Sequence, residues 1–248
     1  MTARPELSIL YPVFDEALNV APLLDHTKEW APRVAASFEV IVVDDGSRDG
    51  SAEAVARACA DDPRIRIVQH PRNRGYGAAL RTGLRAARGR LVFFTDADLQ
   101  FDLRELEGLL GHAERFDVVA GYRASRRDPW PRRLLAFGWG TIVRTVFGLR
   151  VRDIDCAFKV FRREVIESIP IDSIGAFVNT EILLRAAREG FRIHQVPVSH
   201  RPRRYGRQSG ARPRVILRAL LELGRFWREL RREPASAGAP TATAPPGA

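Results

Sequence analysis

The chain of 248 residues contains little cysteine and lysine and no long apolar run. Its two cysteines, Cys59 and Cys156, lie far apart and match no metal-binding or redox spacing, so neither a disulfide framework nor a zinc site is indicated. No segment approaches the roughly 18 uncharged apolar residues of a membrane-spanning helix, and the first seven residues lack the apolar core of a signal peptide. We therefore expect a cytosolic protein with reduced thiols that does not cross a membrane unaided.

Positive charge is abundant and almost all of it is arginine. Forty basic residues face thirty acidic ones, which gives a formal net charge of +10, and Lys28 and Lys159 are the only lysines. Such a chain is expected to bind anions: a nucleotide, a phosphate, a nucleic acid or an acidic membrane surface. With 45% hydrophobic and 28% charged residues it can bury a real core, which excludes disorder, collagen and coiled coil.

Short apolar segments bounded by turn residues alternate with segments of helical periodicity. Buried strands are expected over residues 7–11, 39–43, 65–69, 91–95, 117–120 and 191–198. Helices are expected over residues 16–36, 51–60, 75–88, 103–115 and 180–188. This alternation predicts βα units around a mostly parallel sheet, an α/β fold, within a domain that covers residues 1–211.

Two further helical segments differ from the core helices in composition. Residues 128–149 mix Trp, Phe and Arg, and the basic amphipathic segment 212–232 contains Trp227. Both have the composition of helices that lie among lipid headgroups, although ordinary helices packed on the sheet would also fit. The tail, residues 233–248, is rich in Ala, Pro, Gly and Thr and is expected to be disordered because it has too little apolar bulk to bury.

A pair of carboxylates follows the expected strand 91–95. Asp96 and Asp98 are two residues apart, so in extended geometry they point the same way. This edge of an open α/β sheet is where ligands bind, and hard oxygen ligands suit Mg²⁺ or Mn²⁺ bridging a diphosphate, with Gln100 as a possible third oxygen. The alternative is that both residues merely end the strand and cap the next helix.

Two other expected strands also end in acids. Asp15 and Glu16 follow the first strand, and Asp44 and Asp45 follow the second within a glycine-rich turn. These carboxylates could accept hydrogen bonds from a base or from ribose, although a turn with a helix cap also explains the second pair. We favour a ligand site, because unrelated turns have no reason to collect carboxylates at one edge.

Gly75 and Gly77 do not form a dinucleotide-binding fingerprint. Ala79 and Leu80 stand where a third glycine is required. A Rossmann oxidoreductase is therefore disfavoured. The glycines either let a loop pass close to a ligand or pack the start of a helix.

Five short motifs occur in a characteristic order. They are YPVFDE at 11–16, DDGS at 44–47, NRGYGAA at 73–79, DADLQ at 96–100 and DCAFK at 155–159. Together they resemble the family 2 glycosyltransferases of GT-A fold, specifically the polyprenyl-phosphate glycosyltransferases typified by dolichol-phosphate mannose synthase. The resemblance implies a Rossmann-like, three-layer α/β/α fold with a mostly parallel mixed sheet and peripheral amphipathic helices.

The resemblance also implies an activity. It is inverting transfer of a hexose from a nucleotide sugar of the GDP-mannose or UDP-glucose type to a polyprenyl phosphate at the cytoplasmic membrane face. The implied Mg²⁺ or Mn²⁺ ligands are Asp96, Asp98 and Gln100. The implied nucleotide-sugar site consists of Pro12, Asp15, Glu16, Asp44, Asp45, Asn73, Gly75 and Asp96.

The acceptor sets a different requirement. A phosphate monoester, with a second pKa of about 6, is already ionised at neutral pH and needs cations rather than a base. The expected acceptor-binding residues are Arg123, Arg126, Arg204, Arg207 and Lys159, with Arg123 also catalytic beside Asp96 and Asp98. A solvated basic loop is the alternative for the arginines, and a salt bridge is an equal alternative for Lys159.

Two rival functions remain at this stage. One is a family 2 glycosyltransferase acting on a carbohydrate or glycolipid hydroxyl, in which Glu181 could be a base, although a helix N-terminus favours Glu in any case. The other is an arginine-rich nucleic-acid-binding protein, which the acids at the strand ends oppose by repulsion. We expect as partners a nucleotide sugar, a polyprenyl phosphate and an anionic membrane surface on the cytoplasmic side, and no nucleic acid.

Overall fold

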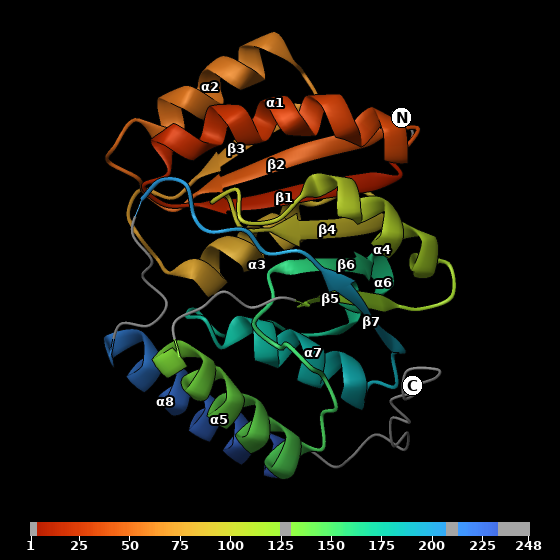
Figure 1. The fold of residues 1–248 in the computed structure, drawn as a ribbon, viewed down its shortest axis with the longest axis vertical. Helices are drawn as coiled ribbons and strands as arrows, with labels where there is room; N and C mark the ends of the chain where they lie inside the picture. The colour runs from red at the N-terminus through yellow and green to blue at the C-terminus, as the bar shows by residue number, and fades with distance from the viewer. Residues whose placement is uncertain (1–3, 125–129, 207–212, 233–248) are drawn as a thin grey trace.

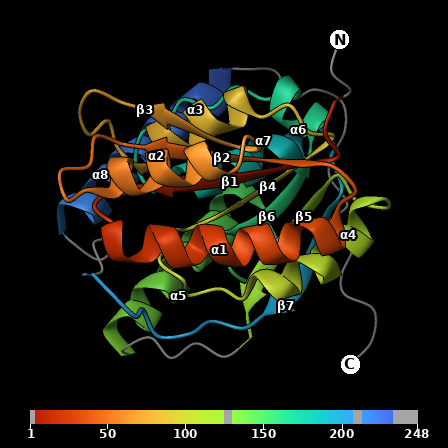
Figure 2. The ribbon, with the colours of Figure 1, turned by 90° about the horizontal axis from the view of Figure 1, so that it is seen from above.

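The computed structural model describes residues 4–124, 130–206 and 213–232, and these form a mixed sheet covered by helices on both faces (Figures 1 and 2). The strands are β1 (Leu7–Val13), β2 (Phe38–Asp44), β3 (Ile65–Gln69), β4 (Leu91–Thr95), β5 (Val118–Arg123), β6 (Phe158–Arg162) and β7 (Ile193–Val198). The helices are α1 (Ala17–Val34), α2 (Ser51–Asp61), α3 (Tyr76–Ala86), α4 (Leu106–Ala113), α5 (Trp130–Phe147), α6 (Arg163–Ser168), α7 (Val178–Arg188) and α8 (Pro213–Arg232), with a 3₁₀ turn, η1, at Leu103–Glu105.

The sheet has the strand order β3-β2-β1-β4-β6-β5-β7. β1 pairs in parallel with β2 and β4, β2 with β3, and β5 with β7, whereas β6 runs antiparallel between β4 and β5. Two antiparallel steps restore the direction, so β1, β2, β4 and β5 all end at the same edge. The segments that follow these strands therefore meet, and this edge is called the acidic edge below.

Each face of the sheet has its own apolar core. α1, α2 and α4 pack on one face, with Leu24 and Leu109 fully buried. α3, α6 and α7 cover the other face, where Leu80 and Leu183 are buried. Because β1 and β2 are buried on both faces along their whole length, their sequences are nearly continuous apolar runs, interrupted only by Ser8, Glu39 and Asp44, and do not alternate. The predicted α/β three-layer architecture is confirmed.

The expected elements are found with small shifts of their ends, and one strand was missed. β6 was not predicted, because its sequence of five residues, FKVFR, carries charges at two positions. Helices were expected in segments 128–149 and 212–232, and α5 and α8 lie there. The division into residues 1–211, 212–232 and 233–248 stays a prediction, and residues 233–248 lie outside the described part of the chain.

α8 and α5 extend the helical layer beyond the sheet (Figure 1). Phe226 of α8 packs against Phe147 of α5 and Phe177, with ring centroids 6.0 and 5.6 Å apart. Other apolar side chains of these helices face solvent: Phe137 is 69% exposed and Leu221 is 66% exposed. Within the described residues, no helix combines the length and apolarity needed to cross a bilayer.

Candidate active site

The turns after β1 and β2 are tied to each other at the acidic edge. The backbone N–H of Asp15 donates to Ser47 Oγ (3.0 Å), and the N–H of Arg48 donates to Asp15 Oδ1 (2.9 Å). The N–H of Glu16 donates to Ser51 Oγ (2.9 Å). Asp15 has a φ of 54°, a left-handed conformation that this network holds in place. The sequence-predicted acids of the first strand thus sit on a turn that the second strand's turn fixes.

Asp44 and Asp45 are both buried, at 2% exposure. Asp44 Oδ1 accepts the N–H of Ser47 (3.2 Å). The Asp45 carboxylate accepts the N–H groups of Arg74 (2.9 Å) and Gly75 (2.8 Å) and contacts His70 Nδ1 (2.6 Å). These bonds hold the loop that leads into α3 against the acidic edge. The structure therefore gives Asp45 a loop-holding role, and nucleotide binding by these two acids stays a prediction.

Asp96 and Asp98 follow β4 in a tight turn that contains Leu99 in a left-handed conformation (φ 60°). Asp98 is 8% exposed, and its Oδ1 accepts the N–H of Gln100 (3.2 Å). Burial, followed by the charge of Asp96, raises the pKa of Asp98 to about 6. Burial also raises the pKa of Asp96, against the lowering effects of the Tyr76 hydroxyl and Lys159. Two acids buried together favour a bound cation.

Arg203 is a site residue that sequence reasoning missed. Its guanidinium makes an ion pair with Glu16 and lies 3.6 Å from an oxygen of Asp98. Burial raises the pKa of Glu16, and the hydrogen bonds from Asn19 and Arg203 lower it. The only available signal was indirect: acids gathered at one edge need a counter-charge, and the arginine-rich segment after β7 offers several.

Gln100 positions that segment. Its Nε2 donates to the carbonyl oxygen of Arg201 (2.9 Å), and the N–H of Arg201 donates to the carbonyl oxygen of Gln100 (2.8 Å). The turn after β4 therefore holds the chain that carries Arg203. The Gln100 amide nitrogen is occupied by this bond, so its amide oxygen is the atom that could bind a cation.

Arg123, at the end of β5, lies in a two-pronged ion pair with Asp153. Nε donates to Oδ2 (2.6 Å) and Nη2 to Oδ1 (2.8 Å), and the two side chains are 6% and 8% exposed. A planar guanidinium matches a carboxylate in this way, which fixes its position. Asp153 was not identified from the sequence. The structure brings Arg123 to the acidic edge, and its predicted role in catalysis and acceptor binding stays a prediction.

The model of glycosyl transferase family 2 matches residues 8–169, well over half of the chain. The chain belongs to glycosyl transferase family 2. The carboxylates of the acidic edge and the strands that carry them fall within the matched segment.

Curated relatives and solved structures agree with this family 2 assignment. Glycosyltransferase AglD of Haloferax volcanii is 33% identical over 213 residues, 81% of this chain and 34% of AglD. Undecaprenyl-phosphate 4-deoxy-4-formamido-L-arabinose transferase of Pseudomonas paraeruginosa is 31% identical over 219 residues, 85% of this chain and 62% of that protein. The chain thus spans less than two thirds of either relative's length.

A solved mannosyltransferase from Pyrobaculum calidifontis, in complex with GDP-Man and Mn²⁺, matches with a TM-score of 0.61 and 25% identity. The match covers 99% of this chain and 67% of the mannosyltransferase. The predicted GT-A fold of this family 2 glycosyltransferase is confirmed.

The position of Lys159 contradicts its predicted role as a ligand of the acceptor phosphate. Its side chain is 1% exposed, and Nζ donates to the carbonyl oxygens of Ile154 (3.1 Å) and Cys156 and to Asn179 Oδ1 (3.2 Å). Burial lowers the pKa of this ammonium group. Since three protein oxygens take its three hydrogens, Lys159 cannot contact an acceptor phosphate from this position.

Glu181 is also part of the buried framework. Its carboxylate accepts the N–H groups of Asp172 (3.1 Å) and Ser173 (2.8 Å) and the Nε–H of Arg185 (3.2 Å), and the residue is 1% exposed. These bonds hold the loop before α7 rather than a substrate. The position does not support Glu181 as a base.

The other predicted residues lie on loops or in β1. Pro12 is buried in β1, Asn73 is exposed, and Arg204 is exposed with its guanidinium 5.5 Å from the Tyr205 ring. Arg126 and Arg207 lie outside the described residues. Among the residues that the structure describes, no group of three or more His, Cys, Asp or Glu could hold a metal, so a cation here would rest on the Asp96 and Asp98 pair.

Proposed function

We propose that the protein transfers a hexose from a nucleotide sugar to a polyprenyl phosphate, with inversion at the anomeric carbon. The observation that carries the proposal is the pair of neighbouring acids, Asp98 buried and Asp96 partly buried, at the edge where β1, β2, β4 and β5 end. Family membership supplies the class of reaction. The acceptor is supported by the Pseudomonas paraeruginosa relative, whose name contains both undecaprenyl phosphate and the sugar 4-deoxy-4-formamido-L-arabinose.

Asp96, Asp98 and the amide oxygen of Gln100 are proposed to hold Mg²⁺ or Mn²⁺. The residues fit such an ion, because burial raises the pKa of both acids and a divalent cation between them would remove that penalty. When bound, the ion would stabilise the negative charge that develops on the leaving nucleoside diphosphate. The Pyrobaculum calidifontis mannosyltransferase holds Mn²⁺ together with GDP-Man.

The donor is proposed to lie over the turns after β1 and β2. Asp15 and Asn73 are exposed there and present polar groups for a base or a ribose, and Pro12, Glu16 and Gly75 complete the proposed pocket. Gly75 has a φ of 103°, and a Cβ on it would lie 2.4 Å from the carbonyl oxygen of Ile174. The loop can therefore follow this path only with glycine, which keeps its backbone close to the proposed donor.

The acceptor is proposed to be a phosphate rather than a hydroxyl. An ionised phosphate needs cations, and Arg123 and Arg203 are fixed at the acidic edge by Asp153 and Glu16. A hydroxyl would require a general base, and the carboxylate of Glu181 is occupied by two backbone N–H groups and Arg185. Arg126, Arg204 and Arg207 remain proposed acceptor ligands.

Contact with the anionic inner face of the membrane is proposed for α5 and α8. Leu217, Leu221 and Trp227 of α8 are 60%, 66% and 37% exposed, and Phe137 of α5 is 69% exposed. The same helices carry many arginines, so they combine apolar side chains with charges that attract acidic headgroups. A long polyprenyl acceptor would reach the acidic edge from that surface.

The transfer reaction is tested with labelled nucleotide sugars. The protein is incubated with a panel of GDP- and UDP-sugars, undecaprenyl phosphate and Mg²⁺ or Mn²⁺, and label is measured in the lipid extract. We expect metal-dependent labelling, lost at least a hundredfold in Asp98→Asn and retained in Asp25→Asn, whose carboxylate is 74% exposed on α1. Labelling of a sugar hydroxyl acceptor with none of the lipid phosphate would contradict the proposal.

Membrane contact is tested separately by vesicle flotation. The double variant Leu217→Ser with Leu221→Ser should bind anionic vesicles at least tenfold more weakly, because inserting each leucine contributes about 1.5–3 kcal/mol. Leu18→Ser is the matched control, since that leucine is 67% exposed on α1. Equal binding by the double variant and the control would argue against α8 as the contact surface.

A further inference from the structure

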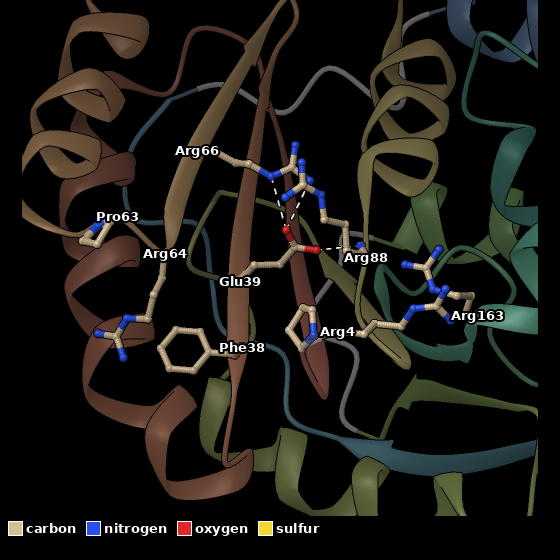
Figure 3. A pocket seen from close by; sticks show the side chains of 9 residues that line it. Arg4, Phe38, Glu39, Pro63, Arg64, Arg66, Arg88 and Arg163 are labelled. Atoms are coloured by element: carbon tan, nitrogen blue, oxygen red, sulfur yellow. Dashed lines mark hydrogen bonds and ion pairs between the residues drawn. The ribbon is translucent and has the colours of Figure 1, made fainter. Parts of the chain in front are cut away.

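A second charged cavity lies at the opposite edge of the sheet, where β1, β2 and β3 begin (Figure 3). Its volume is about 430 Å³, and five arginines line it with a single carboxylate: Arg4, Arg64, Arg66, Arg88, Arg163 and Glu39. We call it the arginine pocket. It is separated from the acidic edge by the length of a strand, about 20 Å at roughly 3.3 Å per residue. It is therefore not part of the proposed transfer site.

The only carboxylate of the arginine pocket is already used. Glu39 Oε2 accepts from Nε and Nη2 of Arg66 (3.2 Å each), and Oε1 accepts the backbone N–H of Arg88 (2.6 Å). Arg64 turns to Asp62, 2.7 Å away. Arg66 and Arg64 are thus neutralised by the neighbouring carboxylates of Glu39 and Asp62.

Arg4 and Arg88 have no carboxylate within 4.0 Å in the described part of the chain, and both are exposed. Arg163 is bound through all three guanidinium nitrogens: Nε donates to the carbonyl oxygen of Gly89 (2.9 Å), Nη1 pairs with Glu167 (3.1 Å) and Nη2 donates to the carbonyl oxygen of Ala87. Arg4 and Arg88 are therefore the pocket arginines without a carboxylate partner among the described residues. In Figure 3 the ends of Arg4 and Arg163 point toward one another, and the Arg88 side chain extends toward Arg66. Like charges that converge in this way repel unless an anion lies between them.

We propose that the arginine pocket binds a phosphate-bearing anion with at least two negative charges. Guanidinium groups bind phosphate oxygens through paired N–H donors, and Arg4 and Arg88 bring theirs to the pocket from the segment before β1 and from the loop after α3, with the bound Arg163 at the start of α6 beside them. A volume of about 430 Å³ accommodates a diphosphate or a phosphorylated headgroup. The ligand is either a free polyphosphate or the headgroup of an anionic phospholipid.

The first experiment titrates inorganic pyrophosphate into the full chain by calorimetry, with EDTA present so that no divalent ion supports binding at the acidic edge. We expect saturable binding, weakened at least tenfold in the double variant Arg4→Gln with Arg88→Gln, because each charge-assisted contact is strong. The charge-matched control is Arg57→Gln with Arg150→Gln, both exposed and outside the pocket, which should change the affinity less than twofold.

The second experiment separates the two sources of phosphate. Flotation with phosphatidylglycerol vesicles is compared with phosphatidylcholine vesicles for the same variants. Loss of phosphatidylglycerol binding in the pocket variant alone would identify a headgroup site, and loss of pyrophosphate binding alone would identify a site for a free anion. Absence of saturable binding of both probes, or equal losses in the pocket and control variants, would overturn the proposal. Thermal unfolding confirms that each variant is folded.

Discussion

Replacing Asp98 by Asn should abolish transfer and, in the absence of metal, make the protein more stable. The pKa of Asp98 is raised from 3.8 to about 6, chiefly by burial and then by the charge of Asp96. Each unit is worth about 1.36 kcal/mol, so the ionised carboxylate costs the fold about 3 kcal/mol at pH 7.5. Asn retains an oxygen that can accept the N–H of Gln100, so the comparison isolates the charge.

The stability gained by Asp98→Asn depends on pH, because it exists only where Asp98 is ionised. An acid whose folded pKa is raised destabilises the folded state only when it is ionised, so the cost is complete above pH 6 and disappears as the pH falls toward 3.8. From the two pKa values, the advantage of Asp98→Asn should be about 3 kcal/mol at pH 7.5, roughly half of that at pH 5 and less than about 1 kcal/mol at pH 4.

Urea unfolding of both proteins in EDTA at these three pH values measures the differences directly. Asp102→Asn is the opposite control: hydrogen bonds from Arg104 lower the pKa of Asp102, so removing its charge should destabilise the fold at neutral pH. A gain in stability that does not change with pH, or a loss at pH 7.5, would refute the reasoning about the buried pair.

Three further substitutions test the packing and the buried ion pairs of the protein. Gly77→Ala should destabilise the protein by about 1–3 kcal/mol in urea unfolding, because its Cβ would lie 2.5 Å from the carbonyl oxygen of Ser173, whereas Gly111→Ala, with nothing within 4 Å, should stabilise α4 by up to about 1 kcal/mol. Glu181→Gln should cost about 3–5 kcal/mol of stability by leaving the buried Arg185 partly uncompensated, yet keep wild-type kcat per folded molecule; a folded but inactive variant would restore the hydroxyl-acceptor alternative.

The layers of the fold and the gathering of acids at one edge of the sheet could be predicted from the sequence. β1 and β2 are mostly apolar, with Ser8, Glu39 and Asp44 as their polar residues, and such runs separated by helical segments leave few topologies open. The position of Asp15, Asp44 and Asp96 follows from that topology, because parallel strands end together. Nothing in this inference depends on side-chain rotamers, which is why it could be made in advance.

The partners of individual charges could not be predicted in the same way. Forty basic residues less the two lysines leave thirty-eight arginines, each of which could pair with an acid. Which acid an arginine contacts depends on the paths of the loops, and the sequence periodicity does not encode those paths. Arg203 instead of Arg204 faces Glu16, and Asp153 rather than a phosphate holds Arg123 in this structure. Lys159 was misplaced for a related reason: β6, which carries it inward, was not anticipated.

The pairing of Glu16 with Arg203 joins positions 187 residues apart. During synthesis the acids that follow β1, β2 and β4 emerge long before their arginine, so the acidic edge exists first as an unbalanced negative cluster. Contacts of such high sequence separation form late, since the whole intervening chain must be ordered before they close. Closure of the site by the segment after β7 is therefore expected to be among the last events of folding, and a chain ending before residue 203 would expose its carboxylates without that counter-charge.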